Sequence, residues 1–566
     1  MAGKRSDFDG DGRAEIPVTS PWGIGILKLS GNTLVASMMA PNGTRFGGWL
    51  LNTGDNRFDL MADFDGDGKT ELLVTSPWGV GVLKLSGTTL TAPMMAPNGT
   101  RFGGWLLNTA DNRFGPVGDF DGDGKAEILV TSPWGIGILK LSGNTFSVLM
   151  MAENGTRFGG WLLNTADNRF SPVGDMDGDG KDEILITSPW GLGVLKLSGS
   201  ALTAPMMAPN GTRFGGWLLN TVDNHLVTSV DLDGDGKAEL LMTSPWGIGV
   251  LKLNGSTLTA PMMAPNGTRF GGWLLNTLDN RIGPAADFDG DGKAELFISS
   301  PWGVGVLKLS GNTFSVPMMA PNGTRFGGWL LNTADNQFDS LADFTGDGRE
   351  DILVTSPWGM GIFRLTGNTF TVPMMAPNGT RFGGWLLNTA DNRFEVGEQT
   401  LRLHIKVLTN PTISIDRMVV AMQQVYESVG IRVHRVSTET LSLPALNDVD
   451  VGGCTRGTVT AEQTQLFGNR NNAWGRDVVV YFVRSTVPPY NGCAAHPQGR
   501  PGAVVAQGAT VWTLGHEVGH VLGLNHVTNN NQLMTGNGTA NITNPPPDLS
   551  STEVNTMRAS TLTFDT

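Results

Sequence analysis

The sequence predicts a multidomain protein: an all-β, seven-bladed β-propeller with four-stranded blades over residues 1–394, followed by an α/β domain over residues 395–566. Three observations lead to this prediction. An acidic run recurs seven times at a constant spacing of 56 residues. Short runs of Val, Ile and Leu between turn sequences fill each repeat unit. After Phe394 the repeat stops, and six of the seven histidines lie beyond that point.

Each repeat unit is expected to form four short strands. In the second unit these are Glu71–Thr75, Val80–Leu85, a third strand at either Thr91–Met95 or Gly104–Leu107, and a fourth leading from Arg113 into Asp119. Four strands in a unit of this length are typical of a propeller blade, and seven blades close a ring that leaves no exposed sheet edge. A linear solenoid is the alternative, but it would need atypical capping repeats, whereas these seven copies are nearly alike.

The acidic run of each unit has the ligand types of a calcium loop. Carboxylates stand at positions one, three, five and nine, and a glycine at position six permits a tight turn. Several oxygen ligands suit a hard cation, so we predict up to seven bound Ca²⁺. The proposed ligands are Asp7, Asp9, Asp11 and Glu15; Asp63, Asp65, Asp67 and Glu71; Asp119, Asp121, Asp123 and Glu127; Asp175, Asp177, Asp179 and Glu183; Asp231, Asp233, Asp235 and Glu239; Asp287, Asp289, Asp291 and Glu295; and Asp343, Asp347 and Asp351.

The calcium loops are not EF-hands, because position twelve holds Val74 in place of a bidentate glutamate. The seventh loop is incomplete, with Thr345 at position three. Acidic turns without a metal are the alternative, and their clustered carboxylates would repel one another. The run resembles the FG-GAP repeats of integrin α-subunit propellers and of related fungal and bacterial lectins. That resemblance covers about 390 residues and implies Ca²⁺ held between two strands of a blade.

Every repeat unit also carries two tryptophans. One set follows Ser-Pro and the other follows Gly-Gly: Trp22, Trp78, Trp134, Trp190, Trp246, Trp302 and Trp358, and then Trp49, Trp105, Trp161, Trp217, Trp273, Trp329 and Trp385. Packing between blades accounts for such large rings. Alternatively, one set lines shallow sugar-binding pockets, with Asn and Arg of the PNGTRF and TADNR segments bonding hydroxyls. Near-identical copies would then bind multivalently. The Asn-Gly-Thr sequons are interpreted as turns.

Charge and hydropathy restrict the partners. The formal net charge of −13 argues against nucleic acid. Residues 398–566 hold 12 acidic and 11 basic residues, so the charge lies in the repeats, where 27 acidic residues are proposed calcium ligands. Filled loops would bring the chain close to neutrality, so an anionic partner is not excluded by charge alone. The sequence has no apolar run long enough to cross a bilayer.

The expected location is extracellular. The first residues show no signal peptide, but such calcium loops usually fill at the calcium level found outside cells, so we expect an exported protein with a trimmed start. We also expect a monomer.

The last third of the chain has an α/β pattern. Leu401–Thr409 alternates like a strand, and Ser414–Gly430 has an apolar stripe at helical spacing, a capping residue and a final glycine. Further strands are expected at Ile431–Thr438 and Asp477–Ser485.

The decisive motif of this domain is HEVGHVLGLNH, residues 516–526. His516 and His520 are four residues apart, so on a helix they point from one face toward one Zn²⁺. Gly523 lets the chain turn back so that His526 becomes the third ligand, and Glu517 lies beside them as general base. A closed structural site needs a fourth protein ligand, which the motif does not supply, so one catalytic zinc is predicted.

The segment resembles the metzincin metallopeptidases, whose extended zinc signature it matches at every fixed position. The resemblance implies that Met534, eight residues beyond His526, forms a matrixin-like Met-turn under the zinc. It also implies that Pro501–Gln507 is the edge strand that pairs with an extended substrate. No matrixin cysteine-switch propeptide is visible in the sequence.

Cys454 and Cys493 are the only cysteines, and both lie in Gly-Cys turns of this domain. A disulfide fits an exported enzyme. Free buried thiols are the alternative, and an extra metal site with His496 is a third.

Together these observations predict a zinc-dependent endopeptidase. Three neutral imidazoles leave one zinc position open to water, and Glu517 takes a proton from that water and delivers it to the leaving amine. Its substrate is a protein or peptide, and the propeller attaches it to a glycan or protein surface. The alternatives are a lectin or adhesin with a vestigial zinc domain, and a propeller that is only a spacer or cover.

Overall fold

The computed structural model describes residues 6–394, 399–426, 429, 431–471, 473, 476–558, 560 and 562–565. The chain forms two compact units, Met1–Gly397 and Glu398–Thr566. The predicted boundary between residues 394 and 395 adjoins residues 395–398, which lie outside the described residues. No helix of the described part is long and apolar enough to cross a bilayer.

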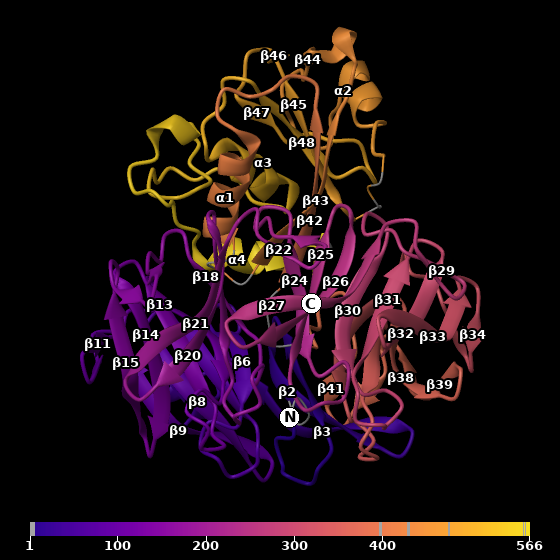
Figure 1. The fold of residues 1–566 in the computed structure, drawn as a ribbon. Helices are drawn as coiled ribbons and strands as arrows, with labels where there is room; N and C mark the ends of the chain where they lie inside the picture. Colours follow the sequence, from indigo (N-terminus) through magenta and orange to yellow (C-terminus); the bar gives the residue numbers. More distant parts are fainter. Residues whose placement is uncertain are drawn as a thin grey trace. The chain divides into compact units, whose positions relative to one another are not determined.

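The first unit is a seven-bladed β-propeller, as predicted, whose blades run from indigo to orange in Figure 1. Each blade is an antiparallel meander. The strands of the first three blades are β1 Glu15–Ser20, β2 Gly23–Ser30 and β3 Thr33–Pro41; β6 Arg57–Ala62, β7 Glu71–Ser76, β8 Gly79–Ser86 and β9 Thr89–Pro97; and β12 Arg113–Gly118, β13 Glu127–Ser132, β14 Gly135–Ser142 and β15 Thr145–Glu153.

The next four blades repeat this pattern. They are β18 Arg169–Pro172, β19 Ile184–Ser188, β20 Gly191–Ser198 and β21 Ala201–Pro209; β24 His225–Val230, β25 Glu239–Ser244, β26 Gly247–Asn254 and β27 Thr257–Pro265; β30 Arg281–Ala286, β31 Glu295–Ser300, β32 Gly303–Ser310 and β33 Thr313–Pro321; and β36 Gln337–Ala342, β37 Asp351–Ser356, β38 Gly359–Thr366 and β39 Thr369–Pro377.

A two-stranded hairpin follows the last strand of each blade. The seven hairpins are β4 Arg45–Phe46 with β5 Trp49–Leu50, β10 Arg101–Phe102 with β11 Trp105–Leu106, β16 Arg157–Phe158 with β17 Trp161–Leu162, β22 Arg213–Phe214 with β23 Trp217–Leu218, β28 Arg269–Phe270 with β29 Trp273–Leu274, β34 Arg325–Phe326 with β35 Trp329–Leu330, and β40 Arg381–Phe382 with β41 Trp385–Leu386.

The first two predicted strands of the second unit and the alternative at Thr91–Met95 for the third are confirmed, but the fourth strand belongs to the next blade, because the blades are offset from the repeat units. The strand before each acidic loop, such as β12, pairs with the strand after that loop and so opens the next blade. The third strand is Thr89–Pro97, whereas Trp105–Leu106 belongs to a separate hairpin. The offset arises because the acidic loop is itself the connection between the first two strands of a blade.

The ring closes between the two ends of the repeat region. The first blade has three strands of its own, and Arg393 supplies a backbone pair to Thr19 at 2.8 and 2.9 Å. Phe394 is buried in a cluster that also contains Ile16 and Phe344, so the first and last blades share one core. Closure of this kind removes the free edges that a solenoid would leave.

The second unit is built on a mixed sheet with few helices. Its strand order is β43 (Ile431–Thr440), β42 (Gln399–Val407), β45 (Val478–Val483), β48 (Gly502–Ala506) and β47 (Gly492–Cys493), and β49 (Thr563–Asp565) also pairs with β42. The first four are parallel to one another, and β47 is antiparallel to β48. A small parallel pair joins β44 (Asp448–Asp450) and β46 (Ser485–Val487).

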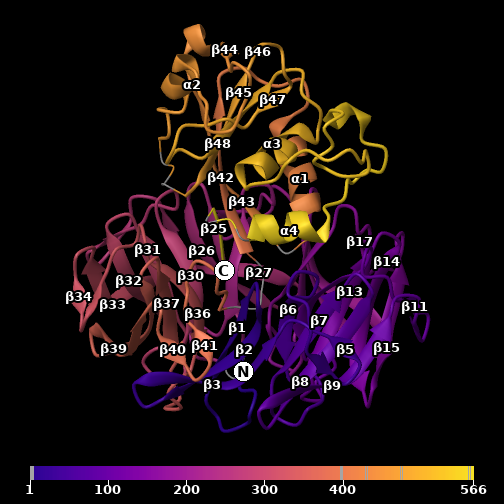
Figure 2. The ribbon, with the colours of Figure 1, turned by 180° about the vertical axis from the view of Figure 1, so that it is seen from behind.

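Both faces of this sheet are buried. Successive residues of β45 alternate between two cores, one containing Val478 and Val480 and the other Val479 and Tyr481. Helices α1 (Ile415–Tyr426) and α3 (Thr513–Val521) lie side by side against the first core in both Figure 1 and Figure 2. The Tyr426 hydroxyl joins them by donating to the Gly515 carbonyl at 2.7 Å.

The remaining helices are short. They are α2 (Ala461–Leu466), α4 (Ser551–Arg558) and the 3-10 turns Pro444–Leu446 and Thr539–Asn541. Helix α1 begins after Ser414, as predicted, but its predicted end at Gly430 lies outside the described residues.

Candidate metal centre

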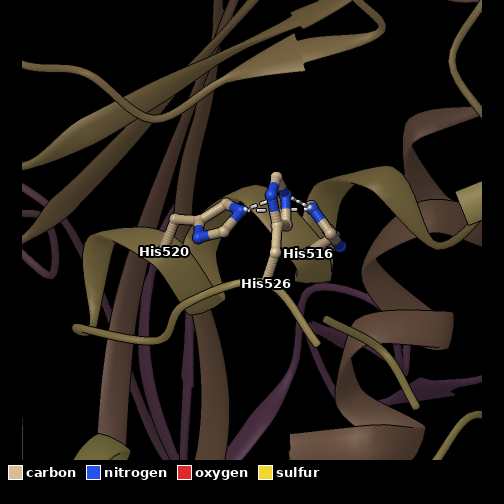
Figure 3. Close-up of side chains that lie close together, drawn as sticks. All are labelled: His516, His520 and His526. Carbon is tan, nitrogen blue, oxygen red and sulfur yellow. Dashed lines mark hydrogen bonds between the residues drawn. The ribbon is translucent and has the colours of Figure 1, made fainter. Parts of the chain in front are cut away.

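Helix α3 brings the three histidines of the motif together (Figure 3). Their Nε2 atoms lie 3.2 Å apart for His516 and His526, 3.2 Å apart for His516 and His520, and 3.0 Å apart for His520 and His526. A tetrahedral zinc with bonds of about 2.0 Å requires nitrogen atoms separated by about 3.3 Å. The three nitrogens therefore have a spacing that fits zinc.

The second nitrogen of each helical histidine is already engaged. His516 Nδ1 lies 2.7 Å from the Leu533 carbonyl, and His520 Nδ1 lies 2.9 Å from the Leu524 carbonyl. Such outer contacts fix the tautomer and leave Nε2 as the free ligand atom. Burial lowers the pKa of His516 to about 4 and also lowers the pKa of His520, so both imidazoles are neutral at pH 7, the form that binds metal.

The chain leaves α3 through Gly523, which has a φ of 113°. That backbone conformation favours glycine and allows the segment to return with His526, whose exposed side chain completes the group. The returning segment is held by a hydrogen bond from the Val527 N–H to the Met534 carbonyl at 2.9 Å. The third histidine is therefore positioned by backbone pairing with the methionine segment.

Met534 packs against helix α3. Its side chain is fully buried, and a methyl group at Gly519 would lie 2.6 Å from Met534 Sδ. Gly519 thus admits the thioether directly against the helix backbone between His516 and His520. Sequence reasoning assigned no role to Gly519, and the Met-turn stays a prediction.

Glu517 is buried beside the histidines, and burial raises its pKa to about 8 in the metal-free protein. Its carboxylate lies against β47: a methyl group at Gly492 would be 2.5 Å from Glu517 Oε1. The edge strand that approaches Glu517 is therefore β47. The predicted edge strand, Pro501–Gln507, is wrong, because β48 is fully buried between β45 and β47.

Substitution of Gly492 tests this close approach. We expect Gly492→Ala to displace the Glu517 carboxylate and to lower any kcat of the centre by about 10-fold or more, since a shift of about 1 Å can cost up to about 100-fold. Gly508→Ala is the matched control, because a methyl group there contacts nothing. Zinc content measured beside kcat separates displacement of Glu517 from loss of the metal, and an unchanged kcat would contradict the assigned contact.

The two cysteines form a disulfide, Cys454–Cys493. It ties the residue after Gly492 to a turn 39 residues earlier. The alternatives of free thiols and of an extra metal site with His496 are not what the structure shows, and His496 Nδ1 instead lies 3.1 Å from the Pro497 carbonyl.

The acidic residues that were predicted as calcium ligands lie close together within their loops. In the first four loops, one oxygen from each of the four acidic residues lies within 4.8 Å of the others. Every complete loop also receives a lysine that sequence reasoning missed. The lysines are Lys28, Lys84, Lys140, Lys196, Lys252 and Lys308, and their Nζ atoms lie 2.7–2.8 Å from the position-five aspartate and 2.7–3.2 Å from the position-nine glutamate.

The pKa values of the lysine and the glutamate of a loop are both raised, but for different reasons. Burial alone would lower the pKa of Lys84, but its bonds to Asp65, Asp67 and Glu71 outweigh burial and raise the pKa. Burial raises the pKa of Glu71 to about 7 although Lys84 opposes the change. The ammonium ion therefore stays charged at pH 7 and stands among the proposed calcium ligands.

The two sets of tryptophans have different environments. The Gly-Gly set is fully buried, and the indole N–H of Trp105 donates to Asn112 Oδ1 at 3.0 Å. The Ser-Pro set is 37–42% exposed, and each member packs on a buried tryptophan of the preceding unit with ring centroids 4.3–4.7 Å apart. Inter-blade packing therefore explains the first set, and part of each indole of the second set remains exposed.

The asparagines proposed to bind sugar are engaged within the protein. Asn98 Nδ2 donates to the Pro77 carbonyl and to Thr109, and its Oδ1 accepts from the Thr109 N–H. Asn112 accepts from Trp105. These asparagines therefore hold the turns of the repeat together, and the sequons are turns, as interpreted. Arg101 of the same segment is exposed.

Parts of the chain are similar to known proteins. The model of the FG-GAP-like repeat matches residues 63–130, 119–186 and 231–298. No curated protein matches the chain. Three similar solved structures are an Agrocybe aegerita lectin that recognises non-reducing terminal N-acetylglucosamine (21% identity, 65% of this chain and 90% of that chain, TM-score 0.45), the periplasmic gluconolactonase of Pseudomonas aeruginosa (13%, 64% and 98%, 0.38) and the archaemetzincin of Methanopyrus kandleri (18%, 28% and 95%, 0.21).

At these identities and scores the three structures assign no activity to this chain. The family model assigns FG-GAP-like repeats to the matched parts of the propeller.

Proposed function

We propose that the second unit is a zinc-dependent endopeptidase of the metzincin type. The observation that supports this most is the convergence of three Nε2 atoms within 3.2 Å of one another, with Glu517 buried on the same helix. Three imidazole ligands and no fourth protein ligand are typical of a catalytic zinc centre.

Each side chain of the centre has one role in this proposal. His516, His520 and His526 would hold the zinc, which would supply a Lewis acid for the reaction. Glu517 would act as general base and then as general acid, taking up a proton from the attacking water and giving it to the leaving amine. The edge strand β47 offers backbone groups to an extended peptide next to Glu517. Met534 supports the helix that carries the ligands.

The experiment that tests this function is cleavage of a proteome-derived peptide library. We expect internal peptide bonds to be cut, and a zinc chelator to abolish cutting. Absence of chelator-sensitive cleavage would contradict the proposal and favour the alternative, an adhesin with a vestigial zinc domain.

A second function is proposed for the propeller, namely multivalent binding of glycans. Seven half-exposed tryptophans, each held rigidly on a buried tryptophan, support it. An aromatic ring fixed in this way loses little conformational freedom when a sugar face packs on it. Seven copies on one ring would raise the avidity for a repetitive ligand above that of one site.

Substitution of the exposed tryptophans tests glycan binding. We expect Trp→Ala at all seven Ser-Pro positions to abolish binding on a glycan array. The matched control replaces the seven hairpin leucines, such as Leu106, which are 38–43% exposed, and should leave binding intact. A variant without the seven tryptophans that remains folded and binds normally would contradict the proposal.

By contrast, Trp105→Ala should lower the free energy of unfolding by about 3–5 kcal/mol, because that ring is fully buried.

The disulfide also supports an extracellular location, since such bonds persist in oxidising compartments.

A further inference from the structure

Each acidic loop of the propeller already contains a cationic group of the chain itself. In the second blade, Lys84 extends from β8 and its Nζ contacts Asp65, Asp67 (2.8 Å) and Glu71 (2.9 Å). These carboxylates are at positions three, five and nine of the loop, which are three of the four proposed calcium ligands. Glu71 and Lys84 are direct cross-strand partners in the sheet, so the backbone register places the lysine there.

The fourth proposed ligand is engaged by the loop backbone. Asp63 Oδ1 accepts from the Gly66 N–H at 2.6 Å, and Asp63 Oδ2 accepts from the Gly68 N–H at 2.8 Å. The corresponding pair of bonds recurs in all seven loops. The first aspartate therefore shapes the turn through the loop backbone.

A second cation borders every loop from its neighbour. The aliphatic stem of Lys69 in the second loop lies against Gly10 of the first, because a methyl group at Gly10 would be 3.0 Å from Lys69 Cε. The same contact repeats around the ring, and Arg13 of the first loop lies against Gly346 of the last. Adjacent loops are also joined by the backbone, as in the bond from the Thr70 N–H to the Asp7 carbonyl at 2.8 Å.

In the seventh loop, both the acidic residues and the cation differ from those of the other six loops. It has Thr345 at position three, and its cation is Arg364 in place of lysine. The guanidinium lies 3.2 Å from Asp347 and 3.0 Å from Asp351. A loop with one carboxylate fewer thus still receives a side-chain cation.

One oxygen of the buried glutamate has an ion pair but no hydrogen bond. Glu71 Oε1 is buried and accepts no hydrogen bond of good geometry. That atom lies 2.9 Å from Lys84 Nζ. Coulomb attraction at that distance does not depend on a linear bond, so the lysine stabilises the charge of this oxygen.

We propose that the seven acidic loops are closed by the chain's own lysine and arginine side chains and that the propeller folds without Ca²⁺. The six lysine ammonium groups and the guanidinium of Arg364 take the position expected for the metal. A chelator would then remove zinc from the second unit while the propeller stays folded.

Calcium content and thermal stability of the wild-type protein test this directly. We expect protein dialysed against 1 mM calcium and then against metal-free buffer to retain no calcium by elemental analysis. We also expect the melting temperature (Tm) of the propeller to be the same in calcium as in a calcium chelator at matched ionic strength. About seven bound calcium ions, or a Tm several degrees higher in calcium, would overturn the proposal.

A lysine variant provides the complementary measurement. Lys84→Met keeps the length of the side chain but leaves three carboxylates without their cation, so we expect the Tm in chelator to fall by about 3 °C. Added calcium should restore part of that loss in the variant alone. The matched control Arg101→Met removes one positive charge from an exposed hairpin of the same repeat unit and should leave the Tm unchanged. A Tm of Lys84→Met equal to that of the control would overturn the proposal. If the variant does not fold, the calcium content and Tm of the wild-type protein decide between the two outcomes.

Discussion

Glu517→Ala is expected to abolish peptide cleavage while the protein retains its zinc. General base catalysis contributes about 100- to 10,000-fold to a rate, so kcat/KM should fall by at least about 100-fold. The ligand nitrogens do not depend on Glu517, because His516 and His520 are oriented by the Leu533 and Leu524 carbonyls. The measurement is kcat/KM on a peptide from the library, together with zinc per chain.

Two further variants make the Glu517 result specific. Glu517→Gln keeps the volume of the side chain next to Gly492 and should lose activity to the same extent, because an amide accepts no proton at pH 7. Glu462→Gln, on helix α2, removes a carboxylate away from the centre and should be fully active. Cleavage by Glu517→Ala at the wild-type rate would show that the assigned base is wrong.

His526→Ala is expected to remove zinc and activity together. The variant leaves two imidazoles, and loss even of an outer contact typically costs about 10- to 100-fold in metal affinity, so loss of a ligand should cost more. The fold should survive, because the His526 side chain is exposed and its segment is held by the backbone pair of Val527 with Met534. The measurement is zinc per chain after dialysis, with the Tm recorded beside it.

His496→Ala is the matched control for the ligand variant. His496 lies outside the group of three histidines and contacts the Pro497 carbonyl. This control should keep both zinc and activity. Retention of zinc by His526→Ala with wild-type affinity would exclude His526 as the third ligand.

Much of the architecture could be predicted because it is encoded locally. The 56-residue period and the short apolar runs between turns, such as Gly79–Ser86, define strands and their number, and near-identity of the units leaves a closed ring as the simplest arrangement. The group of three histidines could be predicted locally as well, because His516 and His520 are one helical turn apart and Gly523 permits the chain to return.

The features that sequence reasoning missed depend on pairing across the chain. Lys84 meets Asp65 only because β8 pairs with β7, and the signal for it was the lysine found at one position in six units. The edge strand was misassigned because strand order within a sheet has no local signature. Strand β47 (Gly492–Cys493) pairs antiparallel with β48 (Gly502–Ala506) on its outer side, so β47 forms the edge of the sheet. The contact between Gly492 and Glu517 follows from that same turn.

Titration of zinc into the metal-free protein tests the central claim most directly. Peptide cleavage and bound zinc are measured on the same samples, with the Tm of the propeller as a check that the chain stays folded. We predict that the cleavage rate rises in proportion to bound zinc and stops rising at one zinc per chain. Cleavage by the zinc-free protein, or one tightly bound zinc without any cleavage of the peptide library, would contradict the assignment of a zinc endopeptidase.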